Sequence, residues 1–320
     1  MLSSRFASQP QPWHFPCMID KLELLLFLAR ERHFGRAAEA AGISQPSLSA
    51  AVKSLEEQFG LTIVERGSRF RGFTPEGERV LDWARRLVGD ARNMRQDIDS
   101  LKRGIGGHLR LGVIPTALPF ITSMTLPFHE RYPAVRFTVT SITSIAILAA
   151  MENVQLDLGI SYIDNEAVGR FQTVPLYEER YALLVAQHHP LAARDTISWA
   201  EAGKLPLCLL TPDMQNRRII DGHLAAAGVS SQPTFESNSM TLLHVHVQTG
   251  RWVSIVAARF AEVFDRLGAL RMVPIVGPAV TQKIGLIAPD REPFTPLVAA
   301  FIASARKIAA SLSSPEAAHR

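Results

Sequence analysis

The apolar residues of the first sixty positions recur at helical spacing in three separate segments. Residues 19–32 carry leucines three and four positions apart, and residues 36–41 form a short alanine-rich segment that Gly42 ends. Ser44 is a suitable N-cap for a third segment, whose apolar residues again lie three and four positions apart. Three short helices, with a glycine turn between the second and the third, predict a helix-turn-helix near residues 36–58.

Two short strand patterns follow the third helix, at residues 61–64 and 70–73, with a basic turn between them. This arrangement is typical of a β-hairpin wing. The turn region carries Arg66, Arg69 and Arg71 within six residues of one another. Because they flank a helix-turn-helix, we expect these arginines to contact DNA phosphates.

A long helix is predicted after the wing, with Thr74 as its N-cap and an end near Arg103. Its apolar positions alternate spacings of four and three residues, which is the pattern of a coiled-coil seam. The seam residues are Val80, Ala84, Leu87, Ala91, Met94, Ile98 and Leu101. A narrow seam with polar flanks predicts a coiled coil with a second copy of the chain; the alternative is a helix packed only on its own domain. Three glycines at 104–107 break the helix and predict a hinge between domains.

From residue 108 onward, strand and helix patterns alternate, which predicts a mostly parallel sheet in an α/β domain. A second lobe is expected at about residues 180–283, followed by a final helix at about 294–312. The predicted strands lie at 109–114, 137–142, 156–160, 181–186, 205–210, 234–236, 253–256, 272–275 and 283–287. The predicted helices before the last one lie at 118–132, 144–153, 215–227 and 240–249.

Composition narrows the function classes only modestly. Apolar residues make up 47% of the chain and the net charge is +4, with a pI near 9.3. A mildly basic chain is compatible with nucleic acid, but the placement of the charge decides. The two cysteines, Cys17 and Cys208, are far apart, which excludes a disulfide framework and a zinc cluster. Cys208 lies in an apolar strand-like run and is expected to be buried.

Catalytic and membrane signatures are missing from the sequence. It contains no nucleophile elbow, P-loop or dinucleotide fingerprint, so we expect neither an enzyme nor a cofactor. His244 and His246 lie two positions apart in a predicted helix, where their side chains diverge, so no metal site is expected. Residues 111–128 lack charge but contain three prolines, which do not suit a spanning helix. Without a signal peptide, the chain is expected to be cytoplasmic.

Several segments resemble one family. Phe34–Glu39 (FGRAAE) and Ile43–Ser49 (ISQPSLS) resemble the helix-turn-helix of LysR-type transcriptional regulators. Leu55-Glu56 with Phe59-Gly60, Glu65-Arg66 and Thr74–Gly77 (TPEG) match the family's helix end, wing and linker start. Weaker matches in the second half are Leu176–Glu179 (LYEE), His189–Leu191 (HPL) and Gly250. The resemblance covers nearly the whole chain after residue 18.

The resemblance implies an α/β chain with a mostly helical winged helix-turn-helix, a dimerising linker helix and a two-lobed effector domain like periplasmic binding proteins. It implies tetramers, built as dimers of dimers, that bind double-stranded DNA at imperfect palindromes and contact RNA polymerase. The expected boundaries are 1–17 for a disordered extension, with Met18 as an alternative start, then 18–74, 75–103, 104–107 and 108–320.

The third helix is expected to enter the major groove, where polar side chains can read base edges. Arg36 and the wing arginines are expected on phosphates. The full set of predicted DNA-binding residues is Arg36, Ser44, Gln45, Pro46, Ser47, Ser49, Lys53, Arg66, Arg69, Arg71 and Thr74. Ala50 and Ala51 stand where the family often has longer polar side chains, so few base-reading groups are expected.

A small-molecule effector is expected between the two lobes, at strand ends and helix starts. Hydroxyls and amides with little positive charge favour a small carboxylate or another small polar metabolite; for each residue the alternative is a helix cap. The candidates are Thr116, Thr143, Ser144, Tyr162, Thr211, Pro212, Asn238 and Ser239. The alternative functions are a small-molecule-binding protein of the solute-binding class and an enzyme on an α/β scaffold.

Overall fold

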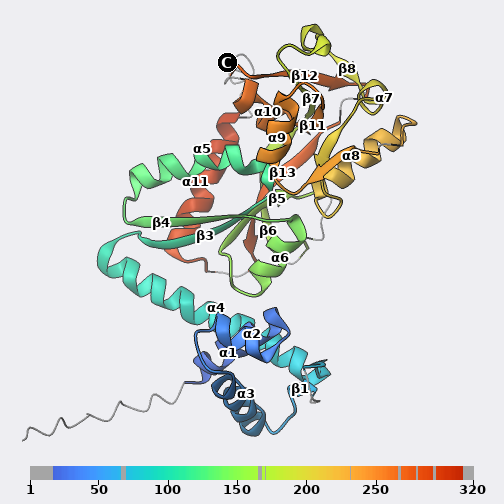
Figure 1. The fold of residues 1–320 in the computed structure, drawn as a ribbon. Coiled ribbons are helices and arrows are strands. Elements are labelled where there is room, and N and C mark those ends of the chain that lie inside the picture. Colours follow the sequence, from blue (N-terminus) through green and yellow to red (C-terminus); the bar gives the residue numbers. More distant parts are fainter. Residues whose placement is uncertain are drawn as a thin grey trace, which may run out of the picture. The chain divides into compact units, whose positions relative to one another are not determined.

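The computed structural model of the 320-residue chain contains two compact units, the first ending at Arg92 and the second beginning at Asn93 (Figure 1). The predicted extension before Cys17, and Arg66 and Arg69 of the predicted wing, lie outside the described residues. The structure describes residues 17–65, 70–164, 168–169, 171–230, 232–265, 268–278, 280–290 and 293–312.

The first unit is built on three short helices around a leucine core. α1 spans Met18–Glu31, α2 spans Phe34–Ala40 and α3 spans Gln45–Phe59. Their apolar stripes face one another, and Leu25 and Leu48 are fully buried. The predicted helix-turn-helix is confirmed, because residues that recur at helical spacing do form one common core.

The wing follows α3 as two very short antiparallel strands, β1 (Val64–Glu65) and β2 (Gly72–Phe73). The predicted strand over residues 61–64 is wrong in its first three positions. There the backbone is held instead by Glu56 of α3, a buried carboxylate that accepts hydrogen bonds from the N–H groups of Ile63 (2.9 Å) and Val64 (3.2 Å). A buried charge needs such partners, so this contact fixes the base of the wing.

The helix after the wing, α4, spans Pro75–Arg103. Thr74 caps it, because its Oγ1 accepts from the N–H of Gly77 at 2.9 Å and donates to the Thr62 carbonyl at 2.6 Å. Gly77 lies so close to the segment before the wing that an added Cβ would stand 2.1 Å from the carbonyl oxygen of Ile63. The helix start and the base of the wing are therefore in direct backbone contact.

The coiled-coil pattern of α4 divides between two environments. Its first half packs into the core of the first unit through Ala84, a predicted seam residue, and through two residues outside the seam, Leu81 and Val88. Val80 and Ala91 are half-buried. Four other seam residues are exposed, from 38% to 82% of the side chain: Leu87, Met94, Ile98 and Leu101. These four leave an apolar strip, so pairing with a second helix stays a prediction.

The first lobe of the second unit contains a five-stranded sheet of order β4-β3-β5-β13-β6. β3 runs parallel to β4 and β5, and β13 runs antiparallel to β5 and β6, so the mostly parallel sheet has one reversed strand. In Figure 1, α5 and α11 cover one face and α6 the other. The bounds are β3 Gly107–Val113, β4 Val135–Ser141, β5 Leu158–Tyr162, β6 Phe171–Glu179, β13 Gln282–Pro289, α5 Leu118–Arg131, α6 Ser144–Glu152 and α11 Pro296–Leu312.

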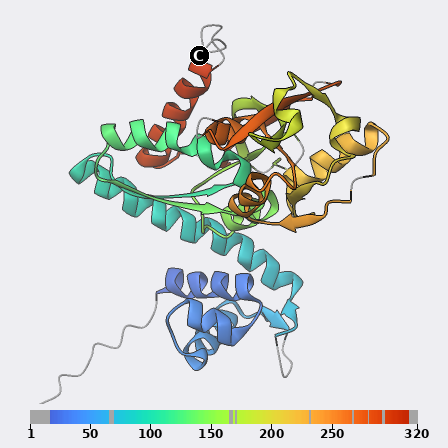
Figure 2. The ribbon, with the colours of Figure 1, turned by 45° about the horizontal axis from the view of Figure 1, so that its top comes forward.

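The second lobe is centred on β7, which pairs antiparallel with β11 and β12 (Figure 2). β12 also pairs in parallel with β8, and β9 pairs in parallel with β10. The chain enters this lobe between Glu179 and Tyr181 and leaves it between Val276 and Gln282. The bounds are β7 Tyr181–Ala186, β8 Ile197–Ser198, β9 Cys208–Leu210, β10 Phe235–Ser237, β11 Ser254–Ala257, β12 Leu270–Val276, α7 Trp199–Ala202, α8 Gln215–Ala226, α9 Met240–Gln248 and α10 Ala258–Asp265.

Sequence reasoning missed β6, β8, α7 and α10. β6 contains Pro175, which normally argues against an inner strand position. The sheet accommodates it at the edge, where the register with β13 shifts between Ile284 and Gly285. No helix within the described ranges is both long and apolar enough to cross a membrane.

Gly77→Ala should destabilise the first unit by roughly 2 kcal/mol, because the new Cβ would clash with the Ile63 carbonyl. Neither the capped helix start nor the hydrogen-bonded base of the wing can move away easily. Thermal unfolding of the full chain measures this. The control is Glu78→Ala, an exposed neighbour in the same turn. Equal melting temperatures for the two variants would contradict the contact.

Candidate functional site

The first candidate site is the exposed face of α3. Ser44 caps this helix: its Oγ accepts from the Ser47 N–H at 3.3 Å and lies 2.8 Å from the Ser47 hydroxyl. Gln45, Ser47 and Ser49 are all exposed, while Leu48 anchors the opposite face in the core. The folded first turn therefore presents amide and hydroxyl groups outward, which are groups able to bond base edges or phosphates.

Cationic residues surround this helix in weakly restrained positions. The Lys53 ammonium lies 3.5 Å from the Glu57 carboxylate, and both side chains are exposed. Arg36 donates to the Glu31 carbonyl at 2.7 Å and remains mostly exposed. Arg71 is exposed beside β2. Exposed ion pairs contribute little stability, so these cations can exchange their partners for phosphates.

Four other predicted DNA contacts have structural duties or lie outside the described residues. The Thr74 hydroxyl is engaged in capping α4, and Pro46 lies in the first turn of α3. Arg66 and Arg69 are not among the described residues. The idea that Ala51 replaces a base-reading side chain is wrong, because Ala51 is only 6% exposed and packs inward. Ala50 is exposed, as expected.

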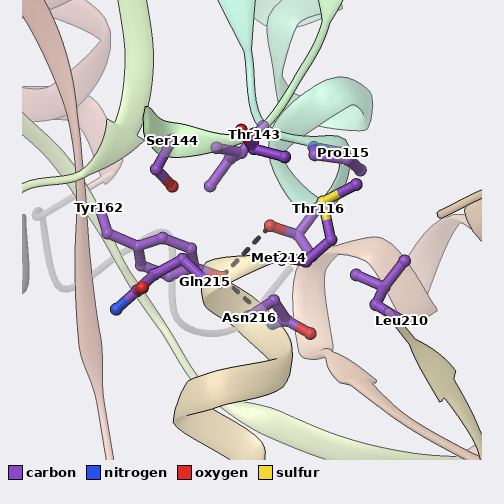
Figure 3. Close-up of a pocket in the computed structure, with 10 residues that line it drawn as sticks. Pro115, Thr116, Thr143, Ser144, Tyr162, Leu210, Met214, Gln215 and Asn216 are labelled. Atoms are coloured by element: carbon purple, nitrogen blue, oxygen red, sulfur yellow. Dashed lines mark hydrogen bonds between the residues drawn. The ribbon is translucent and has the colours of Figure 1, made fainter. Parts of the chain in front are cut away.

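The second candidate site is a pocket between the two lobes of the second unit (Figure 3). Its volume is about 210 Å³, including space open to solvent. The lining carries no ionisable side chain apart from a tyrosine. The residues are Ile114, Pro115, Thr116, Thr143, Ser144 and Tyr162 from the first lobe, and Leu210, Met214, Gln215 and Asn216 from the second.

Half of the predicted effector residues come together here. Thr116, Thr143, Ser144 and Tyr162 line the pocket, whereas Thr211, Pro212, Asn238 and Ser239 are not in its lining. The Ser239 hydroxyl caps α9 by accepting from the Leu242 N–H at 3.3 Å. Sequence reasoning missed the side chains of Met214, Gln215 and Asn216. One signal could have found them: the predicted helix starting at Gln215 has Met214, rather than Ser, Thr, Asp or Asn, at its N-cap position, so no side chain there caps the helix.

Two helix starts reach this pocket, and they differ in how they are capped. Thr143 Oγ1 caps α6 by accepting from the Ala146 N–H at 3.2 Å. The N-cap of α8 is Met214, which offers no side-chain acceptor. The Ser144 hydroxyl is 1% exposed and has no hydrogen-bond partner among the described residues. Unsatisfied donors at a helix start favour a bound anion.

A hydrogen-bond network centred on Tyr162 joins the lobes at the pocket floor. The Tyr162 hydroxyl donates to Glu179 Oε1 at 2.8 Å and accepts from Asn216 Nδ2 at 3.1 Å. Thr116 Oγ1 lies 3.4 Å from the same hydroxyl. In Figure 3, Thr116 and Tyr162 of the first lobe face Asn216 of the second. Tyr162 therefore ties the two lobes together through polar contacts shielded from solvent.

Glu179 gives this network an unusual electrostatic character. Its side chain is fully buried, and burial raises its pKa to about 7, although the Tyr162 hydrogen bond and the Arg259 charge both act to lower it. Burial also raises the pKa of Tyr162 and Tyr177 well above the usual value, with the nearby Glu179 adding to the effect. The Arg259 guanidinium lies 4.6 Å from the centre of the Tyr177 ring. Glu179 is thus a carboxyl group that can change charge near neutral pH.

The thiols and potential metal ligands lie elsewhere. Cys208 is buried, as expected, its Sγ lies 3.9 Å from the Leu243 carbonyl, and burial raises its pKa to about 11. Cys17 is exposed in the first unit. Within the described ranges, no three His, Cys, Asp or Glu side chains are placed to hold a metal ion.

Comparison with known proteins gives two family matches. Residues 102–310 match a family described as the LysR substrate binding domain, and residues 19–78 match one described as the bacterial regulatory helix-turn-helix protein, lysR family. The DNA-binding transcriptional dual regulator OxyR of Escherichia coli (strain K12) is 27% identical over 84% of this chain and 88% of that protein. The hydrogen peroxide-inducible genes activator of Pectobacterium carotovorum is 28% identical over 84% and 89%.

Solved structures share the fold. A full-length OxyR variant from Pseudomonas aeruginosa has a TM-score of 0.68 and 24% identity, covering 91% of this chain and 97% of that one. CbnR in complex with its target DNA has a TM-score of 0.60 and 20% identity, covering 91% and 99%. The two-unit organisation seen here is thus that of full-length regulators.

Glu179→Gln should change how stability depends on pH. The folded-state pKa is raised from 4.5 to about 7, so the native carboxyl keeps a proton that the unfolded chain releases, and this stabilisation is lost as pH rises from about 4.5 through 7. The uncharged glutamine avoids the loss, which amounts to at most about 3 kcal/mol above pH 7. Its melting temperature relative to the wild type should therefore be higher at pH 8 than at pH 5.

The matched control is Glu178→Gln, the same change at the preceding, exposed position of β6. It should track the wild type at both pH values. A Glu179→Gln difference that does not depend on pH would contradict the raised pKa.

Proposed function

This chain belongs to the LysR family of bacterial transcription regulators, and on that premise we propose that it reads a DNA operator through α3 and responds to a small anion held between the lobes of its second unit. The observation that carries the effector part is the buried, unpartnered Ser144 hydroxyl beside the uncapped start of α8. A regulator that acts on the bacterial chromosome works in the cytoplasm.

The DNA-binding part rests on α3 and its surroundings. Gln45, Ser47 and Ser49 project from an exposed, capped helix start, which is the part of a recognition helix that contacts base edges. Arg36, Lys53 and the wing supply the phosphate contacts that position the helix. With Ala50 exposed and short, few side chains read bases, so operator shape and half-site spacing contribute to specificity.

The proposal includes a dimer formed through α4. Leu87, Met94, Ile98 and Leu101 form an exposed apolar strip at coiled-coil spacing, and water contact with such a strip is unfavourable. A twofold dimer would match an imperfect palindrome in double-stranded DNA. Assembly of two dimers into a tetramer and contact with RNA polymerase rest on the family alone.

The effector part rests on the donors that converge in the pocket. Ser144 and the start of α8 offer hydrogen-bond donors without acceptors, and no carboxylate lines the opening. A small carboxylate or inorganic anion complements this arrangement. An enzyme or a solute-binding protein would share the α/β lobes but would have no use for the helix-turn-helix.

Peroxide sensing is a second candidate function, because one relative is named a hydrogen peroxide-inducible genes activator. Thiol-based sensing needs an accessible thiolate of low pKa. Cys208 is buried with a raised pKa, and no cysteine lines the described pocket. The small-anion effector is therefore the better-supported proposal.

Gln45→Ala should weaken operator binding about tenfold or more while leaving binding to random DNA nearly unchanged, because an amide that bonds a base edge contributes about 1–3 kcal/mol of discrimination. Gel-shift titrations on both DNAs measure this. Lys53→Ala is the comparison: loss of a phosphate contact should weaken binding to both DNAs alike and reduce its salt dependence. Equal losses on both DNAs for Gln45→Ala would contradict base reading.

Footprinting of the DNA upstream of the chain's own gene tests the regulator as a whole. Small organic acid anions, added singly, should alter the footprint of the wild type, and Ser144→Ala should weaken that response because the pocket loses a buried donor. Ser123→Ala, on the exposed part of α5, is the control. Hydrogen peroxide should leave the footprint unchanged; a peroxide response lost in Cys208→Ala would overturn the choice between the two candidate functions.

A further inference from the structure

Glu179 does not line the pocket, yet it controls the hydrogen bonds at the pocket floor. We propose that Glu179 determines the specificity of the effector pocket: acting through Tyr162 and Thr116, it sets whether the floor accepts or donates hydrogen bonds, so that an anionic effector binds together with one proton. This inference rests on the proposed effector pocket and names the chemistry by which it selects a ligand.

With Glu179 ionised, every proton in the hydrogen-bond network of Glu179, Tyr162 and Thr116 has a fixed place. The single hydroxyl proton of Tyr162 is donated to Glu179 Oε1, 2.8 Å away. The Tyr162 oxygen can then only accept, and it accepts from Asn216 Nδ2 and from the Thr116 hydroxyl. Thr116 therefore has only lone pairs left for the pocket. A ligand anion placed against Thr116 would meet an acceptor and be repelled.

Protonation of Glu179 reverses the direction of these hydrogen bonds, and no covalent bond is broken. The new proton on Oε1 is donated to the Tyr162 oxygen, and the Tyr162 proton turns to Thr116 Oγ1. The Thr116 proton is then free to point into the pocket. One proton enters at Glu179 and one donor appears at Thr116, while Asn216 keeps its bond to Tyr162.

The position of the proton on Glu179 follows from the partners of its two oxygens. Oε2 is buried and has no hydrogen-bond partner among the described residues. A proton there would be a buried donor without an acceptor, which costs about 1–3 kcal/mol, whereas a proton on Oε1 has the Tyr162 oxygen as its acceptor. The protonated carboxyl therefore acts through Tyr162.

The groups that face Glu179 leave it as the one that titrates. Tyr162 on β5, Tyr177 on β6 and Tyr181 on β7 are buried phenols, whose raised pKa values keep them neutral. Arg259 on α10 supplies a positive charge that acts to lower the pKa of Glu179. Burial brings the pKa of Glu179 to about 7, and an anion added nearby raises it further by like-charge repulsion. Anion binding and proton uptake therefore favour each other.

The test is to measure the binding of sulfate and formate to the full-length protein from pH 5.5 to 8.5. Titration calorimetry at constant ionic strength gives the affinities. Both anions keep their charge over this range. In the wild type, affinity should be nearly constant below about pH 7 and fall about tenfold per pH unit above it, as one linked proton requires. Glu179→Gln, whose amide donates to Tyr162 as the protonated carboxyl does, should bind at every pH as the wild type does at pH 5.5.

Two further variants separate the relay from a general charge effect. Tyr162→Phe keeps the Glu179 carboxyl but cuts its link to Thr116, so affinity at pH 5.5 should fall and the pH dependence should become shallower. Glu178→Gln removes an exposed carboxylate from the adjacent position and should leave the wild-type curve unchanged.

Equal pH dependence in the wild type and Glu179→Gln would overturn the inference, and so would failure of both anions to bind at pH 5.5. Gel shifts on the same samples keep the proposed function apart from this result. Specific DNA binding together with flat anion curves would refute the role of Glu179 alone. Loss of specific DNA binding in the wild type would refute the proposed regulator instead.

Discussion

The N–H groups at a helix start need acceptors, and this requirement shapes both units of the molecule. Ser44 satisfies it for α3, Thr74 for α4 and Thr143 for α6, so each of these helices begins at a fixed residue. α8 begins after Met214, which cannot do the same. The capped start of α6 and the uncapped start of α8 both reach the pocket, and at α8 no N-cap side chain accepts from the first N–H groups, which is why we propose that they serve a ligand.

Local patterns in the sequence were sufficient for most helices and most strands, because apolar spacing and cap residues act over a few positions, although α7 and α10 were missed. The pocket was only half predictable. Thr116 and Tyr162 follow predicted strands, where side chains are expected to converge, but Asn216 bonds a tyrosine 54 positions away. The raised pKa of Glu179 arises from burial among residues of several strands and a helix of both lobes, which no short sequence window contains. Ala51 was wrongly placed on the DNA-facing side of α3, because the sequence gives the residue type but not the direction in which the side chain points.

α4 shows why a heptad pattern alone does not decide a partner. Ala84 and Leu87 both belong to the predicted seam, yet the first is buried in its own unit and the second is exposed. The helix covers the three-helix core with one stripe and leaves a neighbouring stripe uncovered farther along. The same spacing therefore contains residues of both kinds: Ala84 packs within the first unit, whereas Leu87 and the seam residues after Ala91 leave an exposed apolar strip.

The backbone contact at Gly77 limits which residues can occupy position 77. Every missense change in the glycine codon adds a Cβ atom, and that atom alone meets the Ile63 carbonyl at 2.1 Å, whatever side chain follows it. A compensating change elsewhere would have to shift residues 61–64, which Glu56 and Thr74 hold from two sides. Relief would therefore require several coordinated substitutions, so single-step mutation leaves this position with glycine as its one unstrained residue.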